Sequence, residues 1–470
     1  MKDILDDVNL LKKYDVYAFD YIEYPHKSAW STDYTDADAR RDMLETFRKN
    51  PDLPLLFYIH IPFCEQLCWF CICHREIGAK YDRVKAYLRD SLFKEFEIWR
   101  RFFEENGIRP NFREIYMGGG SPTALREPEF DAMLDAIAPF VDVKNLDQFS
   151  IEIDPRRADV DRLRFYHSRG INKMSFGIQD FDPDVQQAVN RVQPPEMIEA
   201  LLTDEIRGYF PSINFDLLVG LPMQTVDTIR ATMERVVAMA PDRISLAYVH
   251  YGPKFHPHQV NMNRKALLPD FFERKRLFMA AVDVLAKTDY VRTGFEHFAK
   301  PRDRVAQAHQ EGRAYYNSLG ATDGDCPTII ATGRASYSTI GEASYFQYVY
   351  EQERYDEILR EGRLPVLRGH RMTRSDLMRR DLIKTLRTYF HLDIARFEAT
   401  WSVDFRATFA RELDVLGEFH ADGLVEIGAD AIRVTEIGKH FANLIGSVFD
   451  EYVTLPRFNA SVRTRAAAAR

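Results

Sequence analysis

Six short apolar runs alternate with longer amphipathic stretches between residues 55 and 249. The runs cover 55–61, 113–119, 148–154, 171–177, 212–218 and 243–249, and each has the composition of a buried strand. The stretches 81–103, 127–140 and 225–240 carry apolar residues at helical spacing. Repeated strand and helix units of this kind predict an α/β fold with a parallel sheet, either barrel-like or doubly wound.

A different pattern begins near residue 365. The stretches 375–390 and 404–423 predict helices, 424–435 predicts a β-hairpin, and a last helix is expected from about 436 to 452. This is the pattern of a helix-rich, winged-helix-like module. The expected wing, "EIGADAI", carries acidic rather than basic residues, which favours a lid or structural role over DNA binding.

Composition and charge narrow the possible partners. The chain has 470 residues, of which 46% are hydrophobic, enough to bury a large core, and its net charge of -8 argues against nucleic acid as a partner. The N-terminus is charged and no apolar run is long enough to span a bilayer, so we expect a cytoplasmic protein with no membrane partner. An odd number of cysteines without regular spacing favours a metal or redox site over a disulfide framework.

Four of the five cysteines lie within ten residues, directly after the first apolar run. Cys64, Cys68, Cys71 and Cys73 follow the spacing C-x3-C-x2-C-x-C, and no second pair of zinc-type ligands accompanies them. Thiolates this close together on one loop are typical of an iron-sulfur cluster. If only three bind, one iron keeps an open position for chemistry, whereas four would leave a cluster that only carries electrons.

Polar or glycine-rich features follow the other apolar runs. The segment "GGGS" (118–121) follows the second run, and Glu152, Gln179 and Asp216 close the third, fourth and fifth. The carboxyl ends of parallel strands meet at one edge of a sheet. We therefore expect these features and the cysteine loop to form one shared site.

The cysteine loop, placed after a strand that opens a βα series, resembles the signature of the radical SAM superfamily. The resemblance implies a partial (β/α)6 TIM-like barrel and a [4Fe-4S] cluster on Cys64, Cys68 and Cys71. It also implies that the free iron binds S-adenosylmethionine (SAM). Reductive cleavage of SAM then gives a 5′-deoxyadenosyl radical that abstracts hydrogen from an unactivated carbon.

The likeness narrows to the oxygen-independent coproporphyrinogen III oxidases, or HemN type. The segments that resemble this family, in order, are "YIHIPFC", "CWFCIC", "GGGSPT", "SIEIDPR", "FGIQDFDPDVQQAVNR", "NFDLLVGLPMQT", "PDRIS", "EHFAKPRD", "RRDLIKTLRTYFHLD" and "HADGLVEI". The resemblance implies an N-terminal extension packing on the site (1–54), the radical SAM barrel (55–365), a HemN-like helical domain (366–455) and a tail (456–470).

The same resemblance assigns residues to bound cofactors. The residues expected around the first SAM are Tyr58, Phe70, Gly118, Gly119, Gly120, Ser121, Glu152, Gln179, Arg191 and Asp216. A second SAM is expected beside the first, and Cys73 matches a family position that is not a cluster ligand. The family also implies a monomer that receives electrons from a reductase such as flavodoxin or ferredoxin.

Several positions depart from the family pattern in the region expected to border the second SAM and the substrate. Asp20, beside Tyr21, stands where the family carries an arginine, and Leu319 replaces a glutamine. Arg334 and Tyr337 lie in "ATGRASYS", where the family reads "GMGVSAIS". A site for the propionates of coproporphyrinogen should be cationic, so these changes predict a diverged paralogue that turns this substrate over slowly.

Three functions remain open at this point. The first is oxidative decarboxylation of a tetrapyrrole such as coproporphyrinogen III. The second is a HemN-like C-methyltransferase or cyclopropanase that uses the second SAM as carbon donor on a different substrate. The third is an iron-sulfur electron carrier or haem chaperone, and Cys73 counts against it because such relatives generally lack this cysteine.

Overall fold

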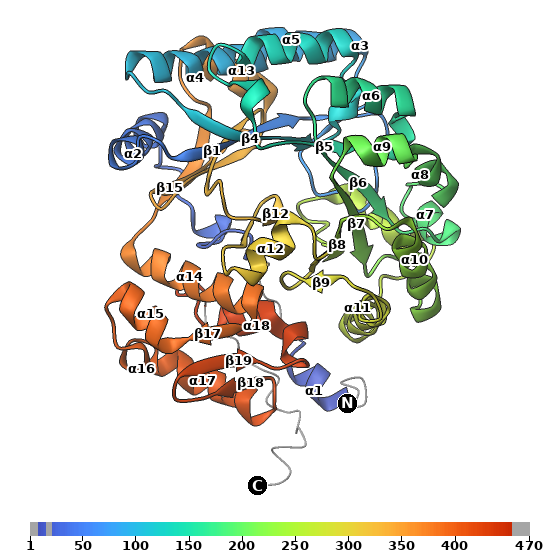
Figure 1. Ribbon diagram of the computed structural model, residues 1–470, viewed down its shortest axis with the longest axis vertical. Helices are drawn as coiled ribbons and strands as arrows, with labels where there is room; N and C mark the ends of the chain where they lie inside the picture. The colour runs from blue at the N-terminus through green and yellow to red at the C-terminus, as the bar shows by residue number, and fades with distance from the viewer. Residues whose placement is uncertain (1–7, 16–20, 454–470) are drawn as a thin grey trace. The chain divides into compact units, whose positions relative to one another are not determined.

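A computed structural model describes residues 8–15 and 21–453, which form two compact units (Figure 1). We call residues 30–268 and 325–372 the sheet unit, and the described residues of 8–29, 269–324 and 373–453 the helical unit. The helical unit thus gathers three separate segments of the chain. The segment boundaries expected from the resemblance stay predictions.

The sheet unit is built on parallel strands that neighbour one another in chain order. The strands are β1 (Pro54–Ile61), β4 (Asn111–Gly119), β5 (Gln148–Ile153), β6 (Lys173–Gln179), β7 (Ser212–Val219) and β8 (Arg243–Tyr248). A doubly wound sheet would reverse its strand order at a switch point, whereas a barrel keeps chain order. The strand predictions are confirmed. The strand order shows that the sheet is barrel-like rather than doubly wound.

Helices cover the outer side of these strands (Figure 1). They include α5 (Glu127–Ile137), α6 (Val160–Ser168), α9 (Asp204–Tyr209) and α10 (Val226–Met239). The expected helix 81–103 is α3 (Tyr81–Tyr87) and α4 (Phe93–Glu105), joined by a π-helical turn over Leu88–Leu92.

An aromatic cluster joins the first strand to its covering helix. Phe57 of β1 lies 5.7 Å from Phe96 of α4 and 5.2 Å from Phe112 of β4, measured between ring centroids. Leu55, Phe57 and Ile59 are fully buried. Strands of a parallel sheet are buried on both faces, which explains why the sequence shows near-continuous apolar runs rather than alternation.

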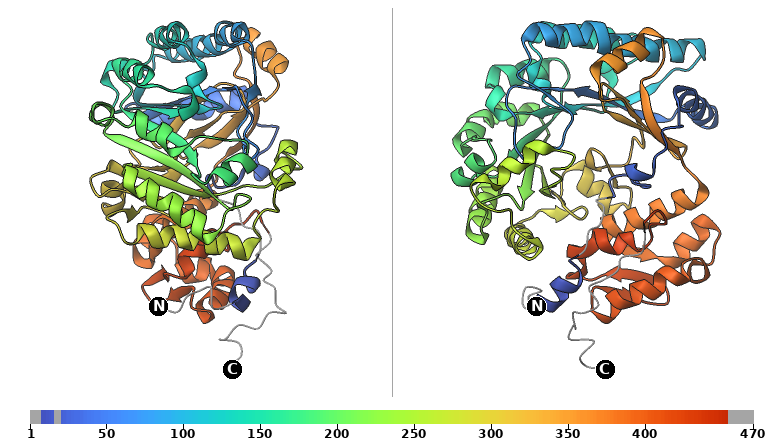
Figure 2. Two further views of the ribbon diagram at one scale, coloured as in Figure 1. Left: turned by 90° about the vertical axis from the view of Figure 1, so that its right-hand side faces the viewer. Right: turned by 180° about the vertical axis from the view of Figure 1, so that it is seen from behind.

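The sheet continues past β1 through strands that the sequence analysis missed. β13 (Thr328–Thr332) pairs parallel with β1, and β14 (Tyr337–Ile340), β15 (Ser344–Tyr348) and β16 (Val366–Arg371) follow antiparallel. In the view from behind, helix α2 (Asp36–Lys49) lies beside β14 and β15 (Figure 2). These strands are short, and β13 to β15 carry Ser and Thr while β16 carries Arg and His, so they lack the continuous apolar signal of the others.

The helical unit contains the winged-helix-like pattern that the sequence predicts. Its C-terminal segment holds α14 (Arg374–Tyr389), α15 (Ile394–Trp401), α16 (Phe405–Thr408), α17 (Ala410–Ala421) and α18 (Ala442–Ser447). The predicted hairpin is β18 (Val425–Ile427) and β19 (Ala431–Val434), with β17 (His391–Asp393) as an unexpected third strand.

Two helix predictions in this unit were wrong in extent. The expected helix 404–423 is divided into α16 and α17 at Phe409, and the expected helix 436–452 shrinks to a 3-10 turn (Gly438–Phe441) followed by α18. Within the described residues, no helix is both long and apolar enough to cross a membrane.

Candidate active site

A two-residue ladder closes the cysteine loop at its base. β2 (Phe63–Cys64) pairs parallel with β3 (Glu76–Ile77), and the N–H of Gly78 donates to the carbonyl of Cys64 at 2.9 Å. The loop therefore leaves the carboxyl end of β1 and returns to it. All four clustered cysteines lie at or inside these two anchor points.

The four thiols differ in exposure and in hydrogen bonding. Cys68 is buried, Cys64 and Cys71 are half-buried, and Cys73 is exposed. Burial raises the pKa of Cys64 to about 12, and the neighbouring Cys71 and Cys68 add to this rise. A hydrogen bond between the Cys71 and Cys73 side chains lowers the pKa of Cys71 to about 6 and raises the pKa of Cys73.

The donor set suits an iron-sulfur cluster. Three thiols on one loop, each electrostatically coupled to another, are the ligand type that such clusters use. Among residues 8–15 and 21–453, no group of three or more His, Cys, Asp or Glu side chains is gathered as a site for a metal ion. The match between this loop and an iron-sulfur cluster therefore rests on the chemistry of the thiols and on the arginine side chains beside them.

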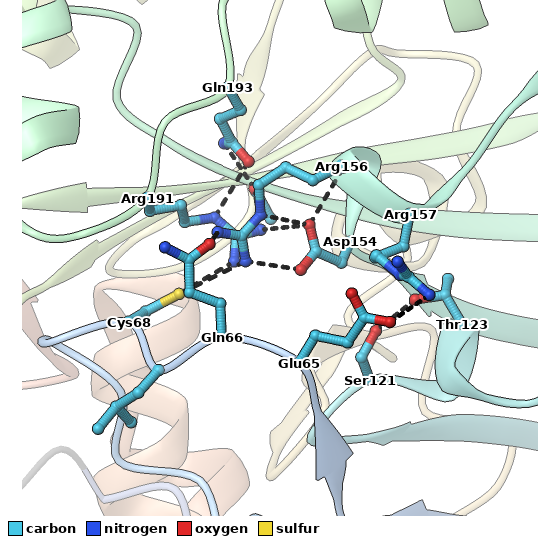
Figure 3. Close-up of polar contacts among 12 residues, drawn as sticks. Glu65, Gln66, Cys68, Ser121, Thr123, Asp154, Arg156, Arg157, Arg191 and Gln193 are labelled. Atoms are coloured by element: carbon cyan, nitrogen blue, oxygen red, sulfur yellow. Dashed lines mark hydrogen bonds and ion pairs between the residues drawn. The ribbon is translucent and has the colours of Figure 1, made fainter. Parts of the chain in front are cut away.

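Two arginines contact the sulfur of Cys68 (Figure 3). Nη1 of Arg191 donates to this sulfur at 3.4 Å, and Nη2 of Arg156 donates to it at 3.7 Å. Asp154 accepts two bonds from the Arg156 guanidinium, at 2.9 and 2.7 Å, and lies 3.8 Å from Arg191. The sequence analysis singled out Arg191 but missed Asp154 and Arg156, although both lie in the quoted "SIEIDPR".

The glycine segment at the end of β4, Gly118 to Gly120, packs closely against neighbouring groups. Gly119 has a φ of +112°, and a Cβ there would lie 2.5 Å from the ring of His60. A Cβ at Gly118 would lie 2.8 Å from the Glu152 carboxyl, and one at Gly120 would lie 2.8 Å from the nitrogen of Phe63. Only glycine fits this path, and Ser121 behind it forms a hydrogen bond with Thr123.

Glu152 and Asp216 form a pair of half-buried carboxyl groups beside this segment. Burial raises the pKa of Glu152 to about 7, and the charge of Asp216 adds to the rise. Burial also raises the pKa of Asp216, against donors from Ser175 at 2.6 Å and Asn214 at 2.8 Å. Two such carboxyl groups create a site that favours a cationic or hydroxyl-rich ligand.

The strand positions of these residues need one correction. Asp216 was expected to close its strand, but it lies in the middle of β7. Glu152 is the penultimate residue of β5, and Gln179 ends β6 with a φ of +66°. Asp216 nevertheless reaches the site because its backbone pairs with Gly177, where the Gln179 and Arg191 side chains also approach.

Tyr58 and Phe70 occupy different surroundings. The Tyr58 ring stacks on Tyr116 with centroids 6.1 Å apart, and Tyr116 donates to Glu152 at 3.2 Å. Phe70 packs on an apolar cluster and accepts a bond from Gln259 at its carbonyl, at 3.0 Å. The cluster contains Val185, Val189, Leu221, Val249 and Met262.

A buried histidine that the sequence analysis missed fixes the end of β1. Burial lowers the pKa of His60 to about 4, so its ring is neutral. Its two nitrogens bond to the Tyr58 hydroxyl at 3.2 Å and to the His74 carbonyl at 3.0 Å. His60 therefore links the strand, the glycine segment and the cysteine loop, and its position inside the apolar run "FYIHIPF" was the available signal.

The residues expected near the substrate or second SAM are distributed over both units. In the helical unit, Tyr21 is buried and donates to Asp450 at 3.0 Å, and the N–H of Leu319 donates to Asn317 at 2.8 Å. Asp20 lies outside the described residues. The expected roles of Tyr21 and Leu319 stay predictions.

The other departures lie in the sheet unit with Cys73. Arg334 is only 6% exposed and forms an ion pair with Glu76 at 3.1 Å. Tyr337 begins β14 and packs edge-on against Trp30, with centroids 5.8 Å apart. The charge of Arg334 is thus offset within the protein, and its role toward a ligand stays a prediction.

Comparisons with known proteins agree with this arrangement. The family model of the radical SAM superfamily matches residues 58–236, and that of the HemN C-terminal domain matches residues 372–441. The oxygen-independent coproporphyrinogen III oxidase of Salmonella typhimurium is 32% identical over 447 residues, which are 95% of each chain. The chain belongs to the oxygen-independent coproporphyrinogen III oxidase family. The Pseudomonas aeruginosa enzyme is 32% identical over 460 residues, 96% of this chain and 97% of its own.

A solved structure of this family matches the fold. The coproporphyrinogen III oxidase (HemN) from Escherichia coli, described as a radical SAM enzyme, superposes with a TM-score of 0.83 at 32% identity. The match covers 92% of this chain and 98% of that one. Family membership makes the chain a radical SAM oxidoreductase whose cofactors are a [4Fe-4S] cluster and SAM. The second SAM and the individual contacts stay predictions.

Proposed function

We propose that this chain uses SAM and a [4Fe-4S] cluster on Cys64, Cys68 and Cys71 to convert propionate side chains of coproporphyrinogen III into vinyl groups. The observation that supports this most is the placement of these thiols on one loop at the carboxyl end of β1. There the sulfur of Cys68 accepts hydrogen bonds from the Arg156 and Arg191 guanidinium groups. The activity of the relatives, oxidation of coproporphyrinogen III, supplies the substrate.

The number of cysteines that bind the cluster decides whether one iron keeps an open coordination position. Cys73 shares a hydrogen bond with Cys71 and stays outside the proposed ligand set, which leaves one iron for SAM. When bound, the reduced cluster would supply the electron that splits SAM into methionine and a radical able to remove a hydrogen atom from the carbon β to a carboxylate. Loss of carbon dioxide, with transfer of one further electron from the substrate to an external one-electron acceptor, would then leave the vinyl group.

The carboxyl pair and the glycine segment would hold SAM. Glu152 already accepts the Gly119 N–H at 3.0 Å, so its second oxygen faces Tyr116 and remains suited to an ammonium group. Asp216 suits the ribose hydroxyls. Arg191, poised between Cys68 and Asp154, suits the carboxylate of the amino acid.

The partners follow from the chemistry. The reaction needs a one-electron donor, and we assign this role to a flavodoxin or ferredoxin in the cytoplasm, acting on a monomeric enzyme. The second candidate function is transfer of a SAM methyl carbon to the substrate, as in a C-methyltransferase or cyclopropanase. It is favoured by Leu319 and Tyr337, which change a hydrogen-bonding amide and add bulk in the region expected to border the substrate.

Anaerobic turnover tests the proposal. Reconstituted protein, dithionite and SAM labelled in its methyl group are incubated with coproporphyrinogen III, and products are identified by mass spectrometry. We expect protoporphyrinogen IX, 5′-deoxyadenosine and no label in the tetrapyrrole. Label in the tetrapyrrole would replace the oxidase by the methyl-transfer function, and absence of 5′-deoxyadenosine would favour the electron carrier.

A further inference from the structure

Arg156 makes a charged contact with a proposed cluster ligand from outside the cysteine loop. It belongs to the 3-10 turn Pro155–Arg157 that directly follows β5. Its Nη2 donates to the sulfur of Cys68 at 3.7 Å, and its side chain is 13% exposed (Figure 3). The contact is therefore largely shielded from water, where a charge-assisted hydrogen bond keeps more of its strength.

Two further residues fix the orientation of this guanidinium. Asp154 accepts from Nε at 2.9 Å and from Nη2 at 2.7 Å, and Gln66 accepts from Nη1 at 3.1 Å. Asp154 also caps the turn by accepting the Arg156 backbone N–H at 3.1 Å. The guanidinium group that donates to the sulfur of Cys68 is thus also fixed by hydrogen bonds to Asp154 and Gln66.

A hydrogen bond from an arginine to a ligating sulfur changes the reduction potential of the cluster. A cationic N–H donor stabilises negative charge on a ligating sulfur, and a reduced cluster carries one more negative charge than an oxidised one. The donor therefore stabilises the reduced form and raises the reduction potential. Arg191 also donates to the sulfur of Cys68. Because Arg191 is proposed to bind the carboxylate of SAM, it can leave Cys68 when SAM binds.

We propose that Arg156 is a positioning residue that holds a permanent hydrogen bond on the Cys68 thiolate and thereby raises the reduction potential of the cluster. This inference rests on the proposed function, because Cys68 must be a cluster ligand.

The chain offers a matched control beside Arg156. Arg157 belongs to the same turn, but it pairs with Glu65 at 2.5 Å and is 46% exposed. Arg156→Gln removes the charge while keeping an amide near Asp154, Arg156→Lys keeps the charge without the planar fork, and Arg157→Gln removes a neighbouring surface charge.

The test is an anaerobic redox titration of each full-length, reconstituted protein without SAM, followed by electron paramagnetic resonance. Iron and sulfide content and melting temperature are measured on the same samples. We expect a lower midpoint potential in Arg156→Gln than in the unmodified protein, a smaller shift in Arg156→Lys, and no shift in Arg157→Gln.

Two results would overturn the inference, and one would overturn the proposed function instead. An unchanged potential in a fully loaded Arg156→Gln protein, or an equal shift in Arg157→Gln, would show that Arg156 does not act on the cluster. If Arg156→Gln loads poorly, the loaded Arg156→Lys protein decides by the same criterion. Failure of the unmodified protein to bind any cluster would refute the proposed function itself.

Discussion

One residue separates Cys71 from Cys73, and the two thiols share a hydrogen bond. This bond lowers the pKa of Cys71 and raises the pKa of Cys73. The sequence could predict a ligand set from spacing. It could not predict this hydrogen bond, because the bond depends on how the loop folds.

The ligand assignment predicts a sharp contrast among cysteine variants. Replacing Cys64, Cys68 or Cys71 by Ala should abolish the cluster and SAM cleavage, since each removes one of three thiolates. Cys73→Ala should retain the cluster. Iron content and the visible absorption spectrum after anaerobic reconstitution report the outcome, and loss of the cluster in Cys73→Ala would refute the assignment.

The raised pKa of Glu152 predicts that SAM binding depends on pH. Its pKa is about 7 in the ligand-free protein, so the carboxyl group loses its charge as the pH falls through this value. A cationic ligand prefers the ionised form, so SAM affinity should fall as the pH decreases from 8 to 6. Glu152→Gln should bind SAM weakly and without this dependence. Isothermal titration at several pH values measures both, and a flat profile in the unmodified protein would contradict the role.

At the scale of elements, the glycine segment at the end of β4 sets how closely the backbone, His60 and Glu152 pack. Gly119→Ala should destabilise the protein and weaken SAM binding more than tenfold, because its Cβ would overlap the His60 ring. Gly107→Ala is the control, since that glycine also has a positive φ, of +64°, but its Cβ would meet nothing within 4 Å. The control should cost about 1 kcal/mol of stability through backbone strain alone and leave SAM binding intact.

A buried carboxyl group joins α4 to two other elements of the sheet unit. Glu95 accepts the N–H of Gly333, after β13, at 2.9 Å and the hydroxyl of Tyr355 in α13 (Gln352–Arg360). Burial raises the pKa of Glu95 to about 7, from 4.5 in the unfolded chain. The native state therefore binds more protons than the unfolded state between these values.

It follows that the Glu95 contribution is fully present below about pH 4.5 and is lost as the pH rises through 7. The free energy of unfolding should thus decline over this window, and Glu95→Gln should flatten the decline. Urea unfolding at pH 5 and pH 7.5 compares the two proteins. Glu104→Gln, at the exposed end of α4, is the control and should retain the decline.

The strands of the sheet unit show which elements the sequence could and could not predict. Runs such as 55–61 and 212–218 are buried on both faces, so their apolar content identified β1 and β7. β13 to β15 were missed because their buried Ser, Thr and Gln residues gain their partners only from tertiary contacts, and β16 was missed because its sequence, VLRGHR, is largely polar. Asp216 was misplaced for a related reason, since a polar residue inside a strand looks like the end of that strand.

At the scale of the whole molecule, one chain supplies two units built from interleaved segments, and family membership extends over nearly its full length. The residues proposed to bind the cluster and the first SAM all fall in the sheet unit. The departures at Tyr21 and Leu319 fall in the helical unit, and those at Arg334 and Tyr337 in the sheet unit. Sequence motifs could identify the cofactors, whereas the substrate depends on side chains that no motif defines.

The most direct test of the central claim follows a hydrogen atom. Coproporphyrinogen III deuterated at the ring-attached carbon of each propionate, β to the carboxylate, is incubated anaerobically with the reconstituted protein, dithionite and SAM, and the 5′-deoxyadenosine is analysed by mass spectrometry. The account predicts deuterium in 5′-deoxyadenosine together with loss of carbon dioxide from the substrate. Formation of 5′-deoxyadenosine without deuterium, or an unchanged substrate, would contradict it.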